Sequence, residues 1–250
     1  TFSYAGYNNY LASTKTVTVT IDRATNTETV NANQNATYGN LASVIVLPEG
    51  IEGYWTLEGV DATTTVGNAG TNTFKAVFTS TTGNYNSRDE IITVTVAKAT
   101  VRVPIVENYE FDEQYHNSGL TNTDKYTITE DIGGIDHGTY RVVLVLNDPA
   151  NYKWATTEEA SVIIEYVISA AVNKWVDAPT IADSWEYESA GDRGSARPLH
   201  GDVKIEYKLE SAADSAYSTT RPTLPGKYVA RFTATADNYT ILQVVEHFEI

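Results

Sequence analysis

The sequence predicts an all-β protein made of small β-sandwich domains in tandem, arranged end to end as an elongated rod. β-branched and aromatic residues are abundant, and no helical periodicity is sustained along the 250 residues. An Asn-Tyr pair between two alternating stretches occurs four times, at intervals of roughly 65–90 residues, which indicates repeated structural units. The segments that join these units are short and contain neither Gly nor Pro, so we expect stiff joints.

The stretch before each Asn-Tyr pair is predicted to be a strand, because apolar residues alternate along it with period two. In "GKYVARFTATADNY", for example, Tyr228, Ala230 and Phe232 share one face. The opening "TFSYAGYNNY" resembles the end of the same strand from a unit whose front half is missing.

The stretch after each pair is predicted to be a second, antiparallel strand. In the first three copies the alternating apolar residues are Val17, Val19 and Ile21; Ile92, Val94 and Val96; and Val162, Ile164, Tyr166 and Ile168. The last copy, "LQVVEHFEI", alternates poorly because Glu246 falls on the face of Val244 and Phe248, and a β-bulge would restore the pattern.

The Asn-Tyr pair itself is interpreted as part of the turn between these two strands. Asn tolerates the left-handed backbone angles of a turn. The Tyr ring can then tuck under the connection while its hydroxyl keeps a polar partner. A ligand-binding role of the pair on the surface is the alternative.

The joints divide the chain into repeats. They read "IDRAT" at 21–25, "VAKAT" at 96–100 and "VISAA" at 167–171. We therefore expect the C-terminal hairpin of a preceding repeat over residues 1–23 and complete repeats over 24–98, 99–170 and 171–250. Domains of this size are near the lower limit for a single core, and the absence of Cys excludes disulfides as support.

Charge and composition exclude several classes of partner. Asp and Glu number 32 against 17 Lys and Arg, which gives a formal net charge of −15. Such a surface repels nucleic acid and anionic lipid. No apolar run approaches the ~20 residues needed to span a bilayer, so no membrane insertion is expected for this segment. Because the sequence also lacks Met, even at its first position, we expect a fragment or a processed product.

The sequence offers no catalytic motif, so we expect no enzymatic activity and no cofactor. The four His residues are scattered and none has the close spacing of a zinc motif. Adjacent carboxylates such as Asp112 and Glu113 point to opposite faces of a strand and cannot act together on one glycosidic bond. No metal site is therefore predicted, although Ca²⁺ at "TNTDKY" or "NDPAN" and a Lys–Asn isopeptide crosslink stay open as alternatives.

Several stretches resemble the tandem Ig-like repeats of large surface proteins of Gram-positive gut bacteria. They include "ATYGNLASVIVLPEGIEGYWTLEG", "GTYRVVLVLNDPANYKWATTEEASVIIEYVISAA" and "STTRPTLPGKYVARFTATADNYT". The resemblance covers nearly the whole chain. It implies Ig-like β-sandwiches at the bacterial cell surface, in a stalk or a binding segment of a wall-attached protein, with neighbouring repeats of the same protein as partners.

Two stretches depart from the usual repeat and are the candidate binding segments, because extra loop length on a scaffold often carries binding function. They are Val106–Gly119 and the longer, more charged Ala182–Gly201. Aromatic and Arg side chains are over-represented at binding hot spots. The candidate binding residues are Trp185, Tyr187, Arg193, Arg197, His200, Tyr109, Phe111 and Tyr115.

These expectations lead to a functional hypothesis of an adhesin. The chain would be a non-catalytic extracellular segment that binds a host protein, such as an immunoglobulin or another secreted glycoprotein, through a preformed β surface. Two alternatives stay open: a mechanical stalk without a ligand, and a glycan-binding module of a secreted glycanase.

Overall fold

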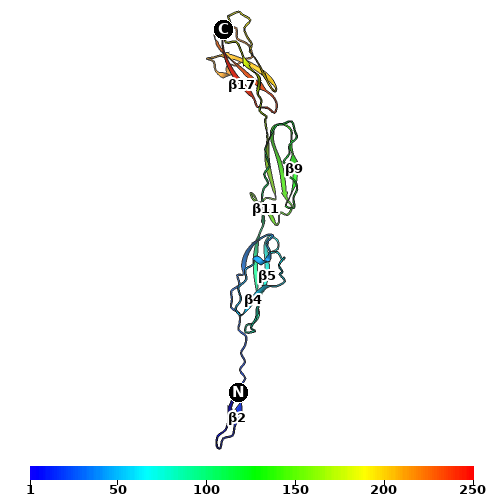
Figure 1. The fold of residues 1–250 in the computed structure, drawn as a ribbon, viewed down its shortest axis with the longest axis vertical. Helices are drawn as coiled ribbons and strands as arrows, with labels where there is room; N and C mark the ends of the chain where they lie inside the picture. Colours follow the sequence, from blue (N-terminus) through cyan, green and yellow to red (C-terminus); the bar gives the residue numbers. More distant parts are fainter. The chain divides into compact units, whose positions relative to one another are not determined.

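The structure, a computed structural model, describes all 250 residues and confirms the all-β class. Its only helical elements are two 3-10 turns, η1 (Ala42–Val44) and η2 (Asp214–Ala216) (Figure 1). The chain forms two compact units: unit 1 contains Thr1–Val101 and Asp148–Glu158, and unit 2 contains Arg102–Asn147 and Glu159–Ile250. None of the helical turns has the length and apolar character of a membrane-crossing helix. The rod arrangement and the domain boundaries stay predictions.

Unit 1 begins with a hairpin of β1 (Phe2–Tyr4) and β2 (Ser13–Lys15), and the first Asn-Tyr pair lies in its loop. The predicted strand over 16–21 is wrong, because the chain after β2 has no strand partner. A strand is stabilised by the hydrogen bonds it exchanges with a neighbour. Without one, Val17, Val19 and Ile21 are 49%, 77% and 89% exposed.

The first sheet has the order β3 (Asn33–Thr37), β6 (Arg88–Ala97), β5 (Gly70–Ser80), β4 (Gly53–Leu57). Strands β5 and β6 are antiparallel, with Phe74 opposite Ile92, whereas β3 pairs with β6 in parallel. The predicted alternation of β6 is confirmed, because Ile92, Val94 and Val96 are all buried. Trp55 of β4 is buried in the same core, as expected for an aromatic residue in an alternating strand.

The second sheet repeats this order in unit 2 with β8 (Tyr109–Glu110), β12 (Ser161–Ser169), β10 (Gly138–Leu146) and β9 (Tyr126–Ile132). Again the central hairpin is antiparallel and the edge strand β8 runs parallel to β12. Tyr140 lies opposite Tyr166, and their rings stack with centroids 5.8 Å apart. The repeated strand order explains why the apolar alternation repeats in the sequence.

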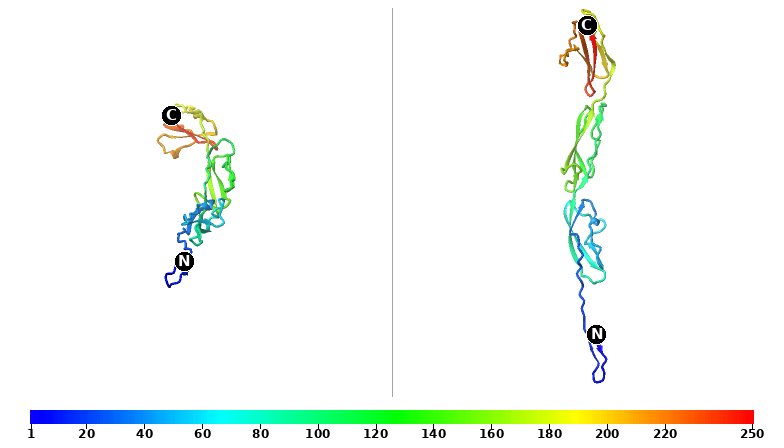
Figure 2. Two further views of the ribbon diagram at one scale, coloured as in Figure 1. Left: turned by 60° about the horizontal axis from the view of Figure 1, so that its bottom comes forward. Right: turned by 90° about the vertical axis from the view of Figure 1, so that its left-hand side faces the viewer.

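The third sheet, also in unit 2, consists of β15 (Asp202–Leu209), β16 (Lys227–Thr235) and β17 (Leu242–Glu249) (Figure 2). A separate pair, β13 (Trp175–Thr180) and β14 (Ser195–Pro198), precedes it. The bulge expected near Glu246 is absent, because the β16–β17 register is continuous and places Glu246 opposite Ala230. Glu246 instead stays half-buried on the face of Val244 and Phe248.

Three of the four Asn-Tyr pairs have a common backbone role. The carbonyl oxygens of Asn84, Asn151 and Asn238 accept the N–H of Ala24, Ala99 and Ala171 at 2.8, 2.9 and 2.9 Å. In unit 1 the second of these contacts begins a parallel pair between β7 (Ala99–Val101) and β11 (Tyr152–Trp154). The expected left-handed conformation is found at Asn238, with φ +67°, but not at Asn84 or Asn151.

Candidate functional site

The candidate site is a pocket of about 290 Å³ in unit 2, which we call the Trp185 pocket. Its lining residues are Trp185, Tyr187, Glu188, Ser189, Arg221, Pro222, Thr223 and Ile250. Three segments form the pocket: the segment between β13 and β14, the loop between β15 and β16, and the C-terminal residue. Two of the eight predicted binding residues, Trp185 and Tyr187, lie in this pocket.

Trp185 is held from behind by the third sheet. Its indole stacks on Phe248, with ring centroids 4.8 Å apart and an interplanar angle of 15°. Its backbone N–H donates to the carbonyl oxygen of Glu249 at 3.1 Å. Because both the ring and the main chain are fixed, the indole contributes a preformed wall to the pocket.

The loop that carries Trp185 is closed by Asp192. One carboxylate oxygen accepts the N–H of Gly194 at 2.9 Å and the other accepts the N–H of Ala182 at 2.8 Å. The backbone hydrogen bonds from Gly194 and Ala182 lower the pKa of Asp192 below its usual value, because they stabilise the charged form. The ionised carboxylate therefore ties the two ends of the segment together.

Gly191 allows the pocket wall to pack closely. Its φ is +57°, in the left-handed region, and a Cβ at this position would lie 2.6 Å from Nε1 of Trp185 and 2.9 Å from Nη1 of Arg221. Arg221 also donates to the carbonyl oxygen of Ala190. The glycine thus brings an indole and a guanidinium together over one peptide segment.

Tyr187 is the accessible aromatic residue of the site, with 53% of its surface exposed. Its exposure contrasts with the half-buried Trp185 beside it. The pocket is therefore lined by an ordered indole, an open phenol and the polar side chains of Glu188, Ser189 and Arg221. Such a mixture of aromatic and convergent polar groups is typical of binding sites.

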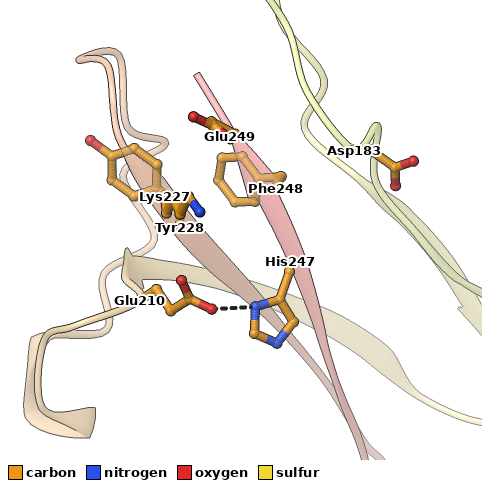
Figure 3. Close-up of a pocket in the computed structure, with 7 residues that line it drawn as sticks. All are labelled: Asp183, Glu210, Lys227, Tyr228, His247, Phe248 and Glu249. Carbon is orange, nitrogen blue, oxygen red and sulfur yellow. Dashed lines mark ion pairs between the residues drawn. The ribbon is translucent and has the colours of Figure 1, made fainter.

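A second pocket, of about 320 Å³, is lined by Phe248 and Tyr228 of the third sheet and by the polar residues around them (Figure 3). Phe248 stacks in turn on Tyr228, with centroids 5.5 Å apart and an interplanar angle of 19°. The pocket is bordered by an ion pair between Nδ1 of His247 and Oε1 of Glu210 at 2.9 Å. Phe248 thus stacks on Trp185, which lines the first pocket, and on Tyr228, which lines the second.

The other predicted residues of the third repeat do not join the pocket. The carbonyl oxygen of Arg193 accepts the hydroxyl of Tyr207 at 2.6 Å, and the Arg193 side chain is exposed. Arg197 pairs with Asp177 on the neighbouring strand at 2.6 Å. The ring of His200 stacks on Tyr239 at 3.8 Å, so His200 belongs to the contacts of the last Asn-Tyr pair.

The predicted residues of the second repeat form contacts of their own. Tyr109 stacks on His116 with centroids 4.1 Å apart, and Phe111 meets Tyr239 edge to face at 5.5 Å. Tyr115 is 60% exposed, and its hydroxyl accepts the N–H of Gly133. Packing therefore accounts for two of these three aromatic residues.

Sequence reasoning missed Arg221 and Gly191. Arg221 lies in "STTRPTLPG", a polar loop that carries no aromatic signal, and its proximity to Trp185 depends on the fold. Gly191 stood in a charged stretch where a glycine indicated only a turn. No group of three or more His, Cys, Asp or Glu side chains in the structure could hold a metal ion.

Comparisons with known proteins add little. No model of a protein family matches the chain, and no curated protein matches it. Among solved structures, the chain is similar to the mixed-linkage glucan utilization locus protein SGBP-B of Bacteroides ovatus in complex with a mixed-linkage heptasaccharide. The TM-score is 0.18 and the identity 14%, over 93% of this chain and 68% of that chain. It is also similar to the extracellular cadherin domains 1–4 of protocadherin gamma B7, with a TM-score of 0.19 and 10% identity, over 80% of this chain and 65% of that chain. Likeness at this level carries no argument about function.

Proposed function

We propose that the chain is a non-catalytic extracellular segment of a bacterial surface protein, and that it binds a secreted host glycoprotein such as an immunoglobulin through the Trp185 pocket. The observation that carries this proposal is the open Tyr187 phenol beside an indole that the third sheet holds in place. Aromatic residues with fixed rings supply contact area at low entropic cost.

The pocket suits binding with little rearrangement. Asp192 closes the loop, and the stack on Phe248 fixes the Trp185 ring before any partner arrives. Preformed surfaces lose less conformational entropy on binding than flexible ones. Arg221 adds a donor that suits a carbonyl or carboxylate of the partner, because a guanidinium presents its donors in a rigid fork.

The test is biolayer interferometry of the full chain on immobilised immunoglobulin A, immunoglobulin G and mucin glycoprotein. The decisive variant is Tyr187→Ala, since Tyr187 is exposed and its removal leaves the core intact. We expect binding to weaken by about tenfold or more, as for a hot-spot tyrosine. The matched control is Tyr54→Ala, which removes an equally exposed tyrosine, 49% accessible, from unit 1.

Two outcomes contradict this proposal. If the Tyr187→Ala and Tyr54→Ala variants bind with equal affinity, the interaction lies outside the Trp185 pocket. No binding to any of the immobilised proteins would remove the host-protein ligand.

A glycan ligand is the second candidate, because an indole and a phenol stand beside Glu188, Ser189 and Arg221 in one pocket. This combination also suits a sugar ring with its hydroxyl groups. A glycan array probed with the full chain and with Tyr187→Ala separates the two ligands. Signal on free glycans that the variant loses favours the module of a glycanase. Signals absent from both the array and the protein surfaces favour the mechanical stalk.

A further inference from the structure

The side chains of two Asn-Tyr pairs contact the sheet of the repeat before them in the same way. In unit 1, Oδ1 of Asn151 accepts the backbone N–H of Ala69 at 2.8 Å, and its Nδ2 donates to Oδ1 of Asn68 at 3.3 Å. In unit 2, Oδ1 of Asn238 accepts the backbone N–H of His137 at 2.7 Å, and its Nδ2 donates to Oδ1 of Asp136 at 2.8 Å. Both asparagines thus accept through Oδ1 and donate through Nδ2 to the repeat before them, and Nδ2 of Asn151 also donates to Oδ2 of Asp148 in its own segment at 2.8 Å.

The tyrosines that follow these two asparagines also make equivalent contacts. Tyr152 meets Tyr38 edge to face, with centroids 5.3 Å apart at 86°, and Tyr239 meets Phe111 at 5.5 Å and 81°. Tyr38 and Phe111 occupy equivalent places, because their N–H groups donate to Ala97 and Ser169, the last residues of β6 and β12, at 2.8 Å each.

The receiving surface therefore has three fixed parts. The first is an aromatic residue that follows the edge strand. The second is the backbone N–H of the residue before a glycine, and the third is the Asn or Asp side chain two residues before the same glycine. The sequences that supply the last two parts are Asn68-Ala69-Gly70 and Asp136-His137-Gly138. A backbone N–H that donates to no acceptor within its own sheet needs an acceptor from outside when the surface is covered.

We propose that these surfaces form a specific docking pair, through which a repeat of this type recognises the Asn-Tyr turn of another. The partner is defined by its chemistry: an amide side chain that accepts and donates at once, followed by a phenol ring. The asparagine that docks is neutral in both cases, and its side-chain partner is the neutral Asn68 in one and the carboxylate of Asp136 in the other.

Two other places in the chain show what the pair requires. Asn84 is exposed and gives its Nδ2 to Glu52 of its own repeat at 2.9 Å. In the third repeat, Trp185 takes the place of Tyr38 and Phe111, since its N–H donates to Glu249 at the end of β17. There the residues before Gly226 are Leu224, which has no polar side chain, and Pro225, which has no N–H. The third repeat thus keeps the aromatic part only, which leaves its Trp185 pocket for a different ligand.

Amide hydrogen exchange of the full chain tests the docking pair, because the N–H groups of Ala69 and His137 are themselves the donors. We expect Asn151→Ala to speed exchange at Ala69, and Asn238→Gly to speed exchange at His137, by about tenfold or more in each case. Gly is chosen at 238 because φ is +67° there and Ala would add backbone strain. Asn84→Ala is the matched control and should change neither amide.

Exchanging the amide and the carboxylate between positions 238 and 136 tests whether the contact is specific. Asn238→Asp alone places a second carboxylate beside that of Asp136, so exchange at His137 should rise as in Asn238→Gly. Adding Asp136→Asn restores one donor and one acceptor in the opposite direction, and exchange should return to within about threefold of the parent chain. Unchanged exchange at Ala69 and His137 in the single variants, or a double variant no better than Asn238→Asp, would overturn the docking pair.

Discussion

The indole of Trp185 lies parallel to the ring of Phe248, with 4.8 Å between the centroids and 15° between the planes. This stack connects the predicted binding loop to the core of the third sheet, where Phe248 is 4% exposed. The pocket and the stability of the third sheet therefore depend on the same side chain.

Trp185→Ala is expected to destabilise the third sheet, because it removes one ring of the stack. Replacement of a fully buried Trp costs about 3–5 kcal/mol, and for the half-buried Trp185 we expect about 2–3 kcal/mol. Trp185→Phe keeps a stacking ring and should recover most of this loss. Chemical denaturation followed by circular dichroism measures both, and equal stability of the Ala variant and the parent chain would show that the stack contributes nothing.

Gly191→Ala is expected to disturb the pocket beyond the strain of the backbone. The left-handed φ costs about 1 kcal/mol for a residue with a Cβ, and the new methyl also collides with Trp185 and Arg221. Gly59→Ala is the matched control, since Gly59 has φ +71° and nothing within 4 Å of a Cβ. Thermal unfolding should show a larger loss of stability for Gly191→Ala than for Gly59→Ala. Equal losses would mean that Trp185 and Arg221 move aside for the methyl group at no cost.

Asp192 makes the loop sensitive to acid. Its folded-state pKa is lowered, mainly by the backbone hydrogen bond from Gly194, so its contribution to stability is present above the unfolded pKa. That contribution is lost as the pH falls from about 3.9, the ordinary value of Asp, through the lowered folded value. Asn at this position keeps an acceptor but cannot titrate. Asp192→Asn should therefore have a flatter stability profile below pH 4 than the parent chain, measured by denaturation at a series of pH values, and parallel profiles would contradict this.

Tyr166→Phe is expected to stabilise the second sheet. The Tyr166 hydroxyl is buried without a hydrogen-bond partner, and burial raises its pKa to about 12. Removing an unsatisfied hydroxyl should add about 1 kcal/mol to the free energy of unfolding. The neighbouring Tyr140 hydroxyl donates to the carbonyl oxygen of Asp136 at 2.8 Å, so Tyr140→Phe should lower it by a similar amount. Urea denaturation of both variants should give changes of opposite sign, and a loss at Tyr166 would indicate a hidden partner.

The sequence predicts where a strand can form but not which strand pairs with it. Period-two alternation was enough to predict β6 and β12, because each has a hydrogen-bonded partner strand on both sides and buries residues of one face. The same alternation over Val17, Val19 and Ile21 predicted a strand that does not form, because alternation says nothing about whether a partner strand is present. The inward-facing Glu246 likewise needed no bulge, since the half-buried edge of the third sheet tolerates it.

The candidate site was predictable only in its aromatic part. Trp185 and Tyr187 stood out by residue type within an unusual stretch. Arg197 and His200 are of equally suitable residue types, yet neither lines the pocket. Arg197 lies on β14 and pairs with Asp177, and His200 lies just after this strand and stacks on Tyr239. Arg221 is distant in sequence, and only the fold brings it to Gly191.

The most direct measurement of the binding claim is the two-dimensional NMR spectrum of the Trp indole N–H groups, recorded while immunoglobulin or mucin glycoprotein is added to the full chain. Trp55 and Trp154 are buried, 6% and 1% exposed, and serve as internal references. The account predicts that the Trp185 resonance shifts or broadens first while those of Trp55 and Trp154 stay in place. A Trp185 resonance unchanged at saturating concentrations of each protein would contradict it.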